Sequence, residues 1–354
     1  MPDTMANVAV IPGDGIGTEV TPAAVRVLNE ALRLEGAAIH WEWLDWGCDY
    51  FATHGRMMPP DGLDILSRHH AVLLGAVGRP DVPDHESLWV LLIPIRQRFD
   101  QYVNLRPIRS FDGVTPAARL PEGADIDMLI VRENTEGEYT RLGGRFAAGT
   151  DHEFAVQEAI FTRHGIDRIA DYAFRAAGTR RNKVTSATKS NGIVHTMPFW
   201  DEVVDAVADR YPGVHLNKEL IDALAAHLVQ EPHAYDVIVA SNLFGDILSD
   251  LAAAVVGGLG LAPSANLNPD GTNPSMFEPV HGSAPDIAGQ GIANPIAAIW
   301  SGALMLEHLG HPEAAARVMT SISTTLADPT THTRDLGGTA STNDVVQACL
   351  ATLA

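Results

Sequence analysis

Two aspartates four residues apart, Asp246 and Asp250, lie in residues 241–250, directly behind a short β-branched run at 235–240. Apolar residues recur at helical spacing over 243–256, which predicts a helix that carries both carboxylates on one face. The pair could form an acidic surface, where repulsion between like charges costs only about 0.2 to 0.5 kcal/mol. It could also belong to a site for a hard divalent cation, which prefers carboxylate oxygens.

A third carboxylate and an amine follow other predicted elements. Asp222 stands in the run K-E-L-I-D-A, and Lys189 comes directly after a β-rich segment at 183–188. If Asp222 converged with the first two aspartates without a cation, each close pair would repel by about 4 kcal/mol at 4 Å and an effective dielectric constant near 20. Converging aspartates therefore predict Mg²⁺ or Mn²⁺. The use of Lys189 as a base depends on that cation, whose charge would favour the neutral amine.

Arginines are concentrated in two parts of this acidic chain. Arg96 and Arg106 lie in one run of the sequence, and Arg132 follows a predicted strand at 128–131. A planar guanidinium group can bind a carboxylate with two parallel hydrogen bonds, so these side chains could hold an acidic substrate. Surface ion pairing is the alternative. Tyr139 ends the polar loop that follows Arg132, where it could simply pack or could transfer a proton.

Composition narrows the class of protein. The chain has 354 residues, 46% of them hydrophobic, and a formal net charge of −20, which disfavours binding to the polyphosphate of nucleic acids. Only two cysteines occur, Cys48 and Cys349, which excludes a disulfide framework and suits a reducing compartment. The apolar segment at 8–11 is too short for a signal peptide or a membrane span. We therefore expect a cytoplasmic protein that does not bind membranes.

Strands and helices alternate along the chain. Apolar segments predict strands at 8–11, 71–74, 128–131, 183–188, 214–216 and 235–240, and helical spacing predicts helices at 166–177, 197–210, 220–229 and 243–256. One more helix is predicted to have Thr21 as its N-cap and Pro22 as its first residue. The alternation is typical of an α/β fold with a largely parallel sheet.

Two glycine-rich turns follow the first two predicted strands. The first is G-D-G-I-G at 13–17, whose spacing differs from the G-x-G-x-x-G fingerprint of Rossmann folds. We expect a tight turn there that is either structural or close to a phosphate. The second turn, at 75–78, begins with Gly75 and could bring the backbone close to a ligand.

Six motifs in a fixed order resemble the isocitrate and isopropylmalate dehydrogenase family, the metal-dependent decarboxylating 2-hydroxyacid dehydrogenases. They are G-D-G-I-G, N-L-R-P, R-E-N-T-E-G-E-Y, T-K-S-N-G, N-L-F-G-D-I-L-S-D and F-E-P-V-H-G-S-A-P-D-I-A-G-Q-G-I-A-N-P. The resemblance implies a two-domain α/β fold with a mostly parallel central sheet, which is not a Rossmann fold. It implies a cofactor-binding domain built from residues 1–102 and 257–354, and a second domain at 103–256 that dimerises and binds substrate and metal.

The same resemblance implies a role for each candidate residue. The substrate carboxylates would be bound by Arg96, Arg106 and Arg132, the enolate protonated with Tyr139, the hydroxyl proton taken by Lys189, and the metal held by Asp222, Asp246 and Asp250. The family is homodimeric with shared active sites, so Lys189 and Asp222 would come from the neighbouring subunit.

The cofactor expected from the resemblance is NAD. The residues implied in its binding are Gly75, Asn191, His281, Gly282, Ser283, Ala284, Asp286 and Asn294. Asp286 favours NAD over NADP, because a carboxylate accepts hydrogen bonds from a ribose hydroxyl and repels a 2′-phosphate.

The substrate expected from the resemblance is a small 2-hydroxydiacid. Trp89 stands where isopropylmalate enzymes have a glutamate, although Leu92 keeps part of their apolar pattern, and an indole leaves room only for a small group on C3. The phrase D-H-x-S-L-W most closely resembles the branch that acts on D-malate and tartrate, which predicts oxidation of D-malate to pyruvate and CO₂, with tartrate as a further substrate. The alternatives are 3-isopropylmalate dehydrogenase and a non-catalytic regulatory subunit. Pro94 alters the local helix geometry near this pocket.

Overall fold

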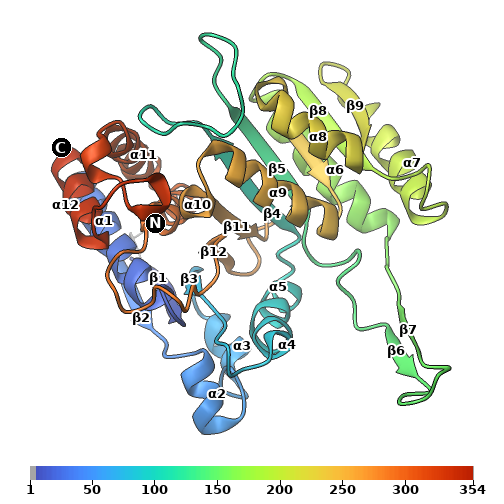
Figure 1. The fold of residues 1–354 in the computed structure, drawn as a ribbon, viewed down its shortest axis with the longest axis horizontal. Coiled ribbons are helices and arrows are strands. Elements are labelled where there is room, and N and C mark those ends of the chain that lie inside the picture. Colours follow the sequence, from blue (N-terminus) through green and yellow to red (C-terminus); the bar gives the residue numbers. More distant parts are fainter. Residues whose placement is uncertain (1–4, 354) are drawn as a thin grey trace.

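The computed structural model describes residues 5–353, so the first four residues of the N-terminal segment lie outside it. Its centre is one ten-stranded sheet with the order β2-β1-β3-β12-β11-β4-β5-β10-β8-β9 (Figure 1). The strands are β1 Ala6–Gly13, β2 Ile39–Trp43, β3 Ala71–Ala76, β4 Val103–Arg109, β5 Asp127–Glu133, β8 Lys183–Thr188, β9 His215–Leu220, β10 Val237–Ala240, β11 Pro263–Leu267 and β12 Ser275–Pro279. Neighbouring strands are parallel except at β12–β11, β11–β4 and β4–β5. The predicted α/β fold with a mostly parallel sheet is confirmed.

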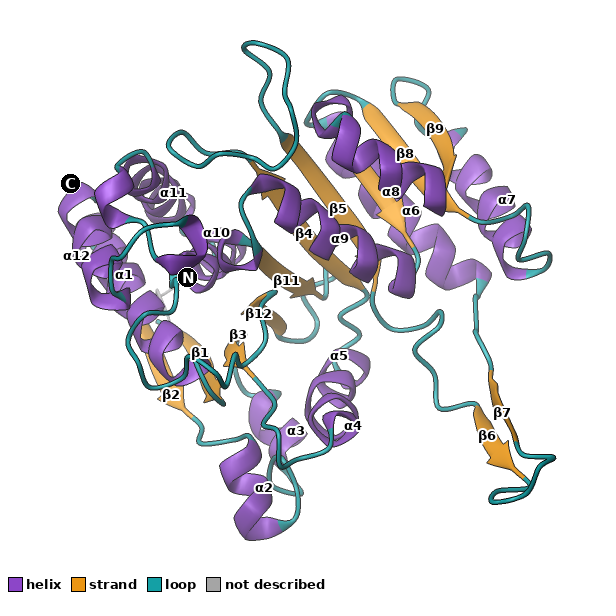
Figure 2. Ribbon diagram, viewed as in Figure 1, coloured by secondary structure: helices purple, strands orange, loops and turns teal. Residues whose placement is uncertain are grey.

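Helices cover both faces of the sheet, as Figure 2 shows. They are α1 Gly17–Glu35, α2 Cys48–His54, α3 Gly62–Leu66, α4 Asp84–Ser87, α5 Ile93–Arg98, α6 Arg163–Gly178, α7 Thr196–Ala208, α8 Ile221–Gln230, α9 Asn242–Val256, α10 Ile296–His308, α11 Pro312–Leu326 and α12 Thr342–Thr352. One π-helical turn, η1 at Leu88–Leu92, joins α4 to α5, and short 3₁₀ turns lie at Pro232–Ala234, Leu259–Leu261, Pro329–Thr331 and Arg334–Leu336.

Side chains on each strand alternate between two apolar layers. In β5, Val131 packs in a core shared with α1, α6, α7 and α10–α12, whereas its neighbour Ile130 packs under α8 and α9. In β3, Leu73 belongs to the first layer and Leu74 to a third cluster under α2, α3 and α5. One sheet face therefore has a continuous apolar core. The other face has two separate clusters, with β4 and β11 between them.

Polar side chains fill the space between those two clusters. Antiparallel pairing sets Asn104 of β4 opposite Arg132 of β5, and Asn266 of β11 opposite Asn104. Because every second residue of a strand shares a face, Arg106 also lies on this side, as do Ser264 of β11 and Glu278 of β12. We call Asn104, Arg106, Arg132, Ser264, Asn266 and Glu278 the polar stripe.

Among the differences from the sequence-based predictions, three concern α1, α7 and a hairpin. Helix α1 begins at Gly17 with Ile16 as its N-cap, so Pro22 lies inside the helix and the prediction that Thr21 caps it was wrong. The reason is tertiary: a Cβ on Gly17 would lie 2.6 Å from the backbone nitrogen of Ala76 in β3, so the helix starts where the backbone packs closely on a neighbouring strand. Helix α7 ends at Ala208, two residues before its predicted end.

The third difference is a hairpin that the sequence analysis did not predict. Strands β6 (Gly143–Phe146) and β7 (Phe154–Gln157) form a separate two-stranded sheet that projects from the molecule (Figure 1). Its residues are exposed throughout, so the hairpin has no core of its own. Among the described residues, no helix is both long and apolar enough to cross a bilayer.

Candidate active site

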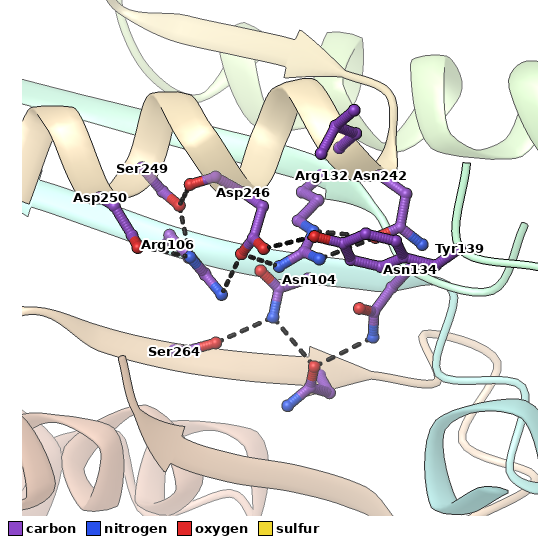
Figure 3. A network of polar contacts seen from close by, with 12 residues as sticks. Asn104, Arg106, Arg132, Asn134, Tyr139, Asn242, Asp246, Ser249, Asp250 and Ser264 are labelled. Atoms are coloured by element: carbon purple, nitrogen blue, oxygen red, sulfur yellow. Dashed lines mark hydrogen bonds and ion pairs between the residues drawn. The ribbon is translucent and has the colours of Figure 1, made fainter. Parts of the chain in front are cut away.

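The centre of the polar stripe is an arginine–aspartate pair that joins two elements. Nη1 of Arg132, at the end of β5, lies 2.5 Å from Oδ1 of Asp246, in the second turn of α9 (Figure 3). Asn242, at the first turn of the same helix, accepts hydrogen bonds from Nε and Nη2 of Arg132 at 3.2 and 2.7 Å. Gly245 allows this approach, because a Cβ there would lie 2.6 Å from the Arg132 side chain. The guanidinium group is thus fixed in one orientation.

A second arginine binds the same face of α9. Nη2 of Arg106 lies 3.3 Å from Oδ1 of Asp246, and its Nη1 lies 3.3 Å from Oδ1 of Asp250 and donates to Ser249. The predicted helix with both aspartates on one face is therefore present. That face meets the cationic part of the polar stripe.

Burial and neighbouring charges shift the pKa values of these groups in opposite directions. Burial alone would raise the pKa of Asp246, but Arg132 and Arg106 hold it below its usual value. Burial raises the pKa of Asp250 and lowers that of Arg132 to about 10. At neutral pH Asp246 is therefore negative beside the two arginines, and the arginines have spare donors for an anionic ligand.

Tyr139 completes this centre. Its hydroxyl donates a hydrogen bond to Oδ2 of Asp246 at 2.9 Å, and its ring lies under the guanidinium of Arg132, with 5.6 Å between Cζ and the ring centroid. Burial, together with the charge of Asp246, raises the pKa of Tyr139 to about 12. The phenol keeps its proton at neutral pH and can donate it.

Three glutamates position the loop that carries Tyr139. Glu133 is buried and accepts hydrogen bonds from the backbone N–H groups of Thr135 and Glu136 and from the Thr135 hydroxyl. Glu136 accepts from the backbone N–H of Thr162, just before α6. Glu138 accepts from the Ser241 hydroxyl and the Leu243 N–H, where α9 begins. Each end of the loop is therefore bound to a helix that borders the site.

Arg96 lies at the opposite end of the polar stripe. It is buried, and its Nη2 lies 2.8 Å from Oε1 of Glu278. The same Glu278 oxygen accepts from Nδ2 of Asn266, whose Oδ1 accepts from both Asn104 and Asn134. A continuous chain of buried hydrogen bonds thus links Arg96 to the loop of Tyr139.

Cavities lie along this arrangement. One of about 140 Å³ is lined by Gly75, Leu92, Arg96, Arg106, Glu278, His281 and Gly282, among others. A larger one of about 700 Å³ borders Trp89, Tyr139, Arg141 and Leu243. Leu92, Arg96 and Arg106 therefore line the smaller cavity, whereas Trp89 and Tyr139 line the larger one.

Lys189 and Asp222 form a separate pair. Lys189 follows β8, Asp222 lies in the first turn of α8, and their side chains make an ion pair. This hydrogen bond from Lys189 lowers the pKa of Asp222, whose side chain is 66% exposed. Within residues 5–353 of a single chain, no group of three or more acidic, histidine or cysteine side chains could hold a metal ion. One chain therefore does not assemble all three predicted metal ligands.

The predicted cofactor loop is bound to the first glycine turn. The N–H of Ile16 donates to the carbonyl of Ser283 at 2.8 Å, and a Cβ on Gly15 would lie 2.0 Å from that oxygen. The glycine turn thus has a structural role. Ala284 has a φ of +40°, a strained value for a residue with a Cβ, so the loop is held in a fixed conformation.

The other predicted cofactor residues occupy four settings. Asp286 and Gly282 are exposed, and so is Asn191, beside Lys189. His281 has an Nε2 that is buried without a hydrogen-bond partner among the described residues, and burial lowers its pKa. The side chain of Asn294 donates a hydrogen bond to the carboxylate of Asp335 and accepts one from the N–H of Ile296. Gly75 lies inside β3, where the backbone of Pro12 leaves no room for a Cβ, so its predicted turn begins two residues later, after Ala76.

The sequence analysis missed the asparagines and Glu278 of the polar stripe. The signal was present as polar residues at every second position in strands that are otherwise apolar, as in V-N-L-R and P-S-A-N-L. It also missed Asn242 and Arg141. Neither belongs to a local pattern, since each contacts a segment far away in the chain.

Comparison with known proteins agrees with this geometry. The family model for isocitrate/isopropylmalate dehydrogenase matches residues 7–349. The chain is 53% identical to the D-malate dehydrogenase [decarboxylating] of Escherichia coli (strain K12) over 349 residues, 97% of each chain. It is 52% identical to the tartrate dehydrogenase/decarboxylase of Pseudomonas putida over 363 aligned positions, covering 100% of this chain and 99% of that one.

A solved structure gives the same result for the fold. The crystal structure of isocitrate dehydrogenase from Methylococcus capsulatus superposes with a TM-score of 0.89 at 36% identity, covering 99% of both chains. The chain belongs to the isocitrate/isopropylmalate dehydrogenase family. It is a decarboxylating 2-hydroxyacid dehydrogenase, related at about half of its residues to enzymes named for D-malate and tartrate. The family and enzyme class predicted from the motifs are confirmed.

Proposed function

We propose that this enzyme oxidises D-malate with NAD⁺ to pyruvate and CO₂, and that tartrate is a further substrate. The observation that carries the proposal is the convergence of Arg106, Arg132 and Tyr139 on Asp246. It supplies fixed positive charge for a dicarboxylate and a protonated phenol beside it. The similarity to the D-malate and tartrate enzymes supports this choice of acid.

Each residue would act by its position. Arg96, Arg106 and Arg132 bind the two carboxylates, and their buried hydrogen bonds keep the substrate oriented. Lys189 would accept the hydroxyl proton of the substrate, and a bound NAD⁺ would supply the acceptor for the hydride from C2. Loss of CO₂ from the resulting 2-oxoacid leaves an enolate, which Tyr139 helps to protonate at C3. Trp89 and Leu92 border the space beside C3.

The donor set fits a divalent cation when two chains contribute. Asp250 and Asp222 have exposed carboxylates, with 55% and 66% of their side chains accessible, and Asp246 is held ionised by its arginines. Hard oxygen ligands of this kind suit Mg²⁺ or Mn²⁺. A bound cation would supply Lewis acidity that polarises the substrate oxygens and stabilises negative charge.

We further propose a homodimer in which Lys189 and Asp222 of one chain complete the site of the other. Large apolar side chains are exposed next to these residues and along the projecting hairpin: Ile193, Val194, Val229, Ile247, Leu142, Phe146, Phe154, Val156 and Ile160. Exposed apolar surface of this extent is typical of an interface. The two proposed domains, 1–102 with 257–354 and 103–256, meet where β11 pairs with β4.

NAD⁺ is the proposed cofactor, bound along the loop at 281–286, with Asn191 and Asn294 as further contacts. The unpartnered Nε2 of His281 and the exposed carboxylate of Asp286 are available to a ligand. A carboxylate at Asp286 would repel the 2′-phosphate of NADP⁺. We also propose a reducing, cytoplasmic location, in keeping with Cys48 and Cys349, which are both free and buried.

One substrate panel tests the proposed function. Purified enzyme with Mn²⁺ is assayed for NADH and NADPH formation from D-malate, tartrate, 3-isopropylmalate and isocitrate. We expect the highest kcat/KM with D-malate and NAD⁺. A preference for 3-isopropylmalate would contradict the choice of substrate, and absence of turnover with every acid would support the regulatory alternative.

A further inference from the structure

Trp89 lies in an unusual turn of the backbone. It belongs to η1, where the N–H of Ile93 donates to the carbonyl of Leu88, five residues earlier. The next bond of this π register would run from residue 94 to the carbonyl of Trp89. Residue 94 is Pro94, which has no N–H. The backbone of this turn therefore leaves the Trp89 carbonyl without its local donor.

Arg141 supplies that donor from the other side of the cavity. Its Nη2 donates to the Trp89 carbonyl at 2.9 Å, although the two residues are 52 positions apart in the chain. Its Cζ also lies 5.0 Å from the centroid of the Trp89 ring. One guanidinium group thus satisfies the carbonyl and stacks on the indole of the same residue, which fixes both the turn and the ring.

This contact separates two cavities. Trp89 and Arg141 line the cavity of about 700 Å³ that borders Tyr139 and Leu243. They also line a neighbouring cavity of about 400 Å³, whose other walls are Ile93, Pro94, Gln97 and Arg98. The indole with its guanidinium is therefore the wall between these two spaces. If that wall moved, the space beside Tyr139 would extend into the second cavity.

We propose that Arg141 determines substrate specificity by acting through Trp89. It holds the indole where a bulky group on C3 of the substrate would otherwise lie, so the enzyme favours acids with a hydrogen or hydroxyl at that carbon. Arg141 is a positioning residue and takes no part in bond making or breaking. The inference rests on the proposed function, because it assigns the C3 side of that same site.

The test compares the ratio of kcat/KM for D-malate to kcat/KM for 3-isopropylmalate. Arg141→Gln removes the cation and should lower this ratio about fivefold, chiefly through a lower KM for 3-isopropylmalate. Arg141→Lys keeps the charge but loses the planar fork of the guanidinium group. Its ratio should therefore lie between those of the wild type and Arg141→Gln. Arg33→Gln is the matched control, because Arg33 pairs with Glu30 on the exposed face of α1 and should leave the ratio unchanged.

A second variant separates a direct effect from one exerted through the indole. In a Trp89→Leu background, Arg141→Gln should no longer change the ratio. An unchanged ratio in Arg141→Gln alone would overturn the inference, and so would an equal change with and without the indole. Wild-type enzyme that fails to oxidise D-malate contradicts the proposed function itself, which is a different outcome from active enzyme with unaltered discrimination.

Discussion

The proposed site draws on two charged pairs that the fold treats very differently. Arg132 belongs to the polar stripe and is 2% exposed, and Asp246 of α9, with 33% of its side chain accessible, faces it; each has further partners. Lys189 and Asp222 lie at an edge, where each contacts mainly the other and Asp222 is 66% exposed. The first pair is complete within one chain. The second has free surface that a substrate, a cation and a second chain could share.

This difference separates residues that position from residues that react. A buried ion pair must be hydrogen-bonded throughout, because an unpaired charge in the interior is costly. Such a pair can hold a substrate but has little freedom to change its protonation state. An exposed pair can exchange partners when a ligand binds. Its residues are therefore better suited to transfer a proton.

The largest effect is expected from breaking the buried pair. Arg132→Met would leave Asp246 with only Arg106 and Tyr139, and we expect a loss on the order of 3 kcal/mol in the free energy of unfolding together with loss of turnover. Urea unfolding and steady-state assays measure both quantities. A variant that keeps wild-type stability would show that the pair contributes little to the fold.

The exposed pair should separate activity from stability. Lys189→Met should reduce kcat by about 10² to 10⁴ because the hydroxyl proton loses its acceptor, whereas Tm and the dissociation constant of NAD⁺ should stay near wild type. Calorimetry and NAD⁺ titration provide those controls. Undiminished turnover would refute the role of Lys189.

A subunit-mixing experiment tests whether Tyr139 and Lys189 of one site come from different chains. If each site takes Tyr139 from one chain and Lys189 from the other, Lys189→Met and Tyr139→Phe are each inactive as homodimers but complement each other. After subunit exchange at equal concentrations, half of the dimers are mixed and each has one intact site, so about a quarter of wild-type activity should return. No recovery, with exchange verified by mass, would place both residues in one chain's site.

Local patterns predicted much of the fold. Strand β8 has the predicted bounds, because a short β-branched run between turns has few alternatives. The start of α1 was wrong, since the Thr21-Pro22 cap pattern is local whereas the packing of Gly17 against Ala76 of β3 is tertiary. The β6–β7 hairpin was missed because an exposed hairpin shows no alternation of apolar and polar residues.

The sequence predicted individual residues of the candidate site but not which of them contact one another. The spacing of Asp246 and Asp250 was sufficient to predict their shared helix face. The pairing of Asp246 with Arg132 spans 114 positions, and no local spacing encodes it. The polar stripe depends on the register of four strands that form three antiparallel pairs, and register is set by the assembled sheet.

A pH-dependent effect is expected at the start of the loop that follows β5 and carries Tyr139. Burial raises the pKa of Glu133 to about 7, from an ordinary value of 4.5, although three hydrogen bonds partly offset it. A carboxyl group with a raised pKa binds its proton more tightly in the folded state. Its contribution to stability is therefore complete below pH 4.5 and is lost as the pH rises through 7, by up to about 3 kcal/mol.

Glu133→Gln isolates this contribution, because an amide has no proton to release over that range. We expect the free energy of unfolding in urea to fall between pH 5 and pH 8 by about 1 to 3 kcal/mol more in the wild type than in the variant. Any fixed cost of the amide facing the Thr135 N–H cancels in this difference. Equal pH dependence in both proteins would mean that the loop carrying Tyr139 holds an ionised Glu133 without penalty, and that its hydrogen bonds fully replace water.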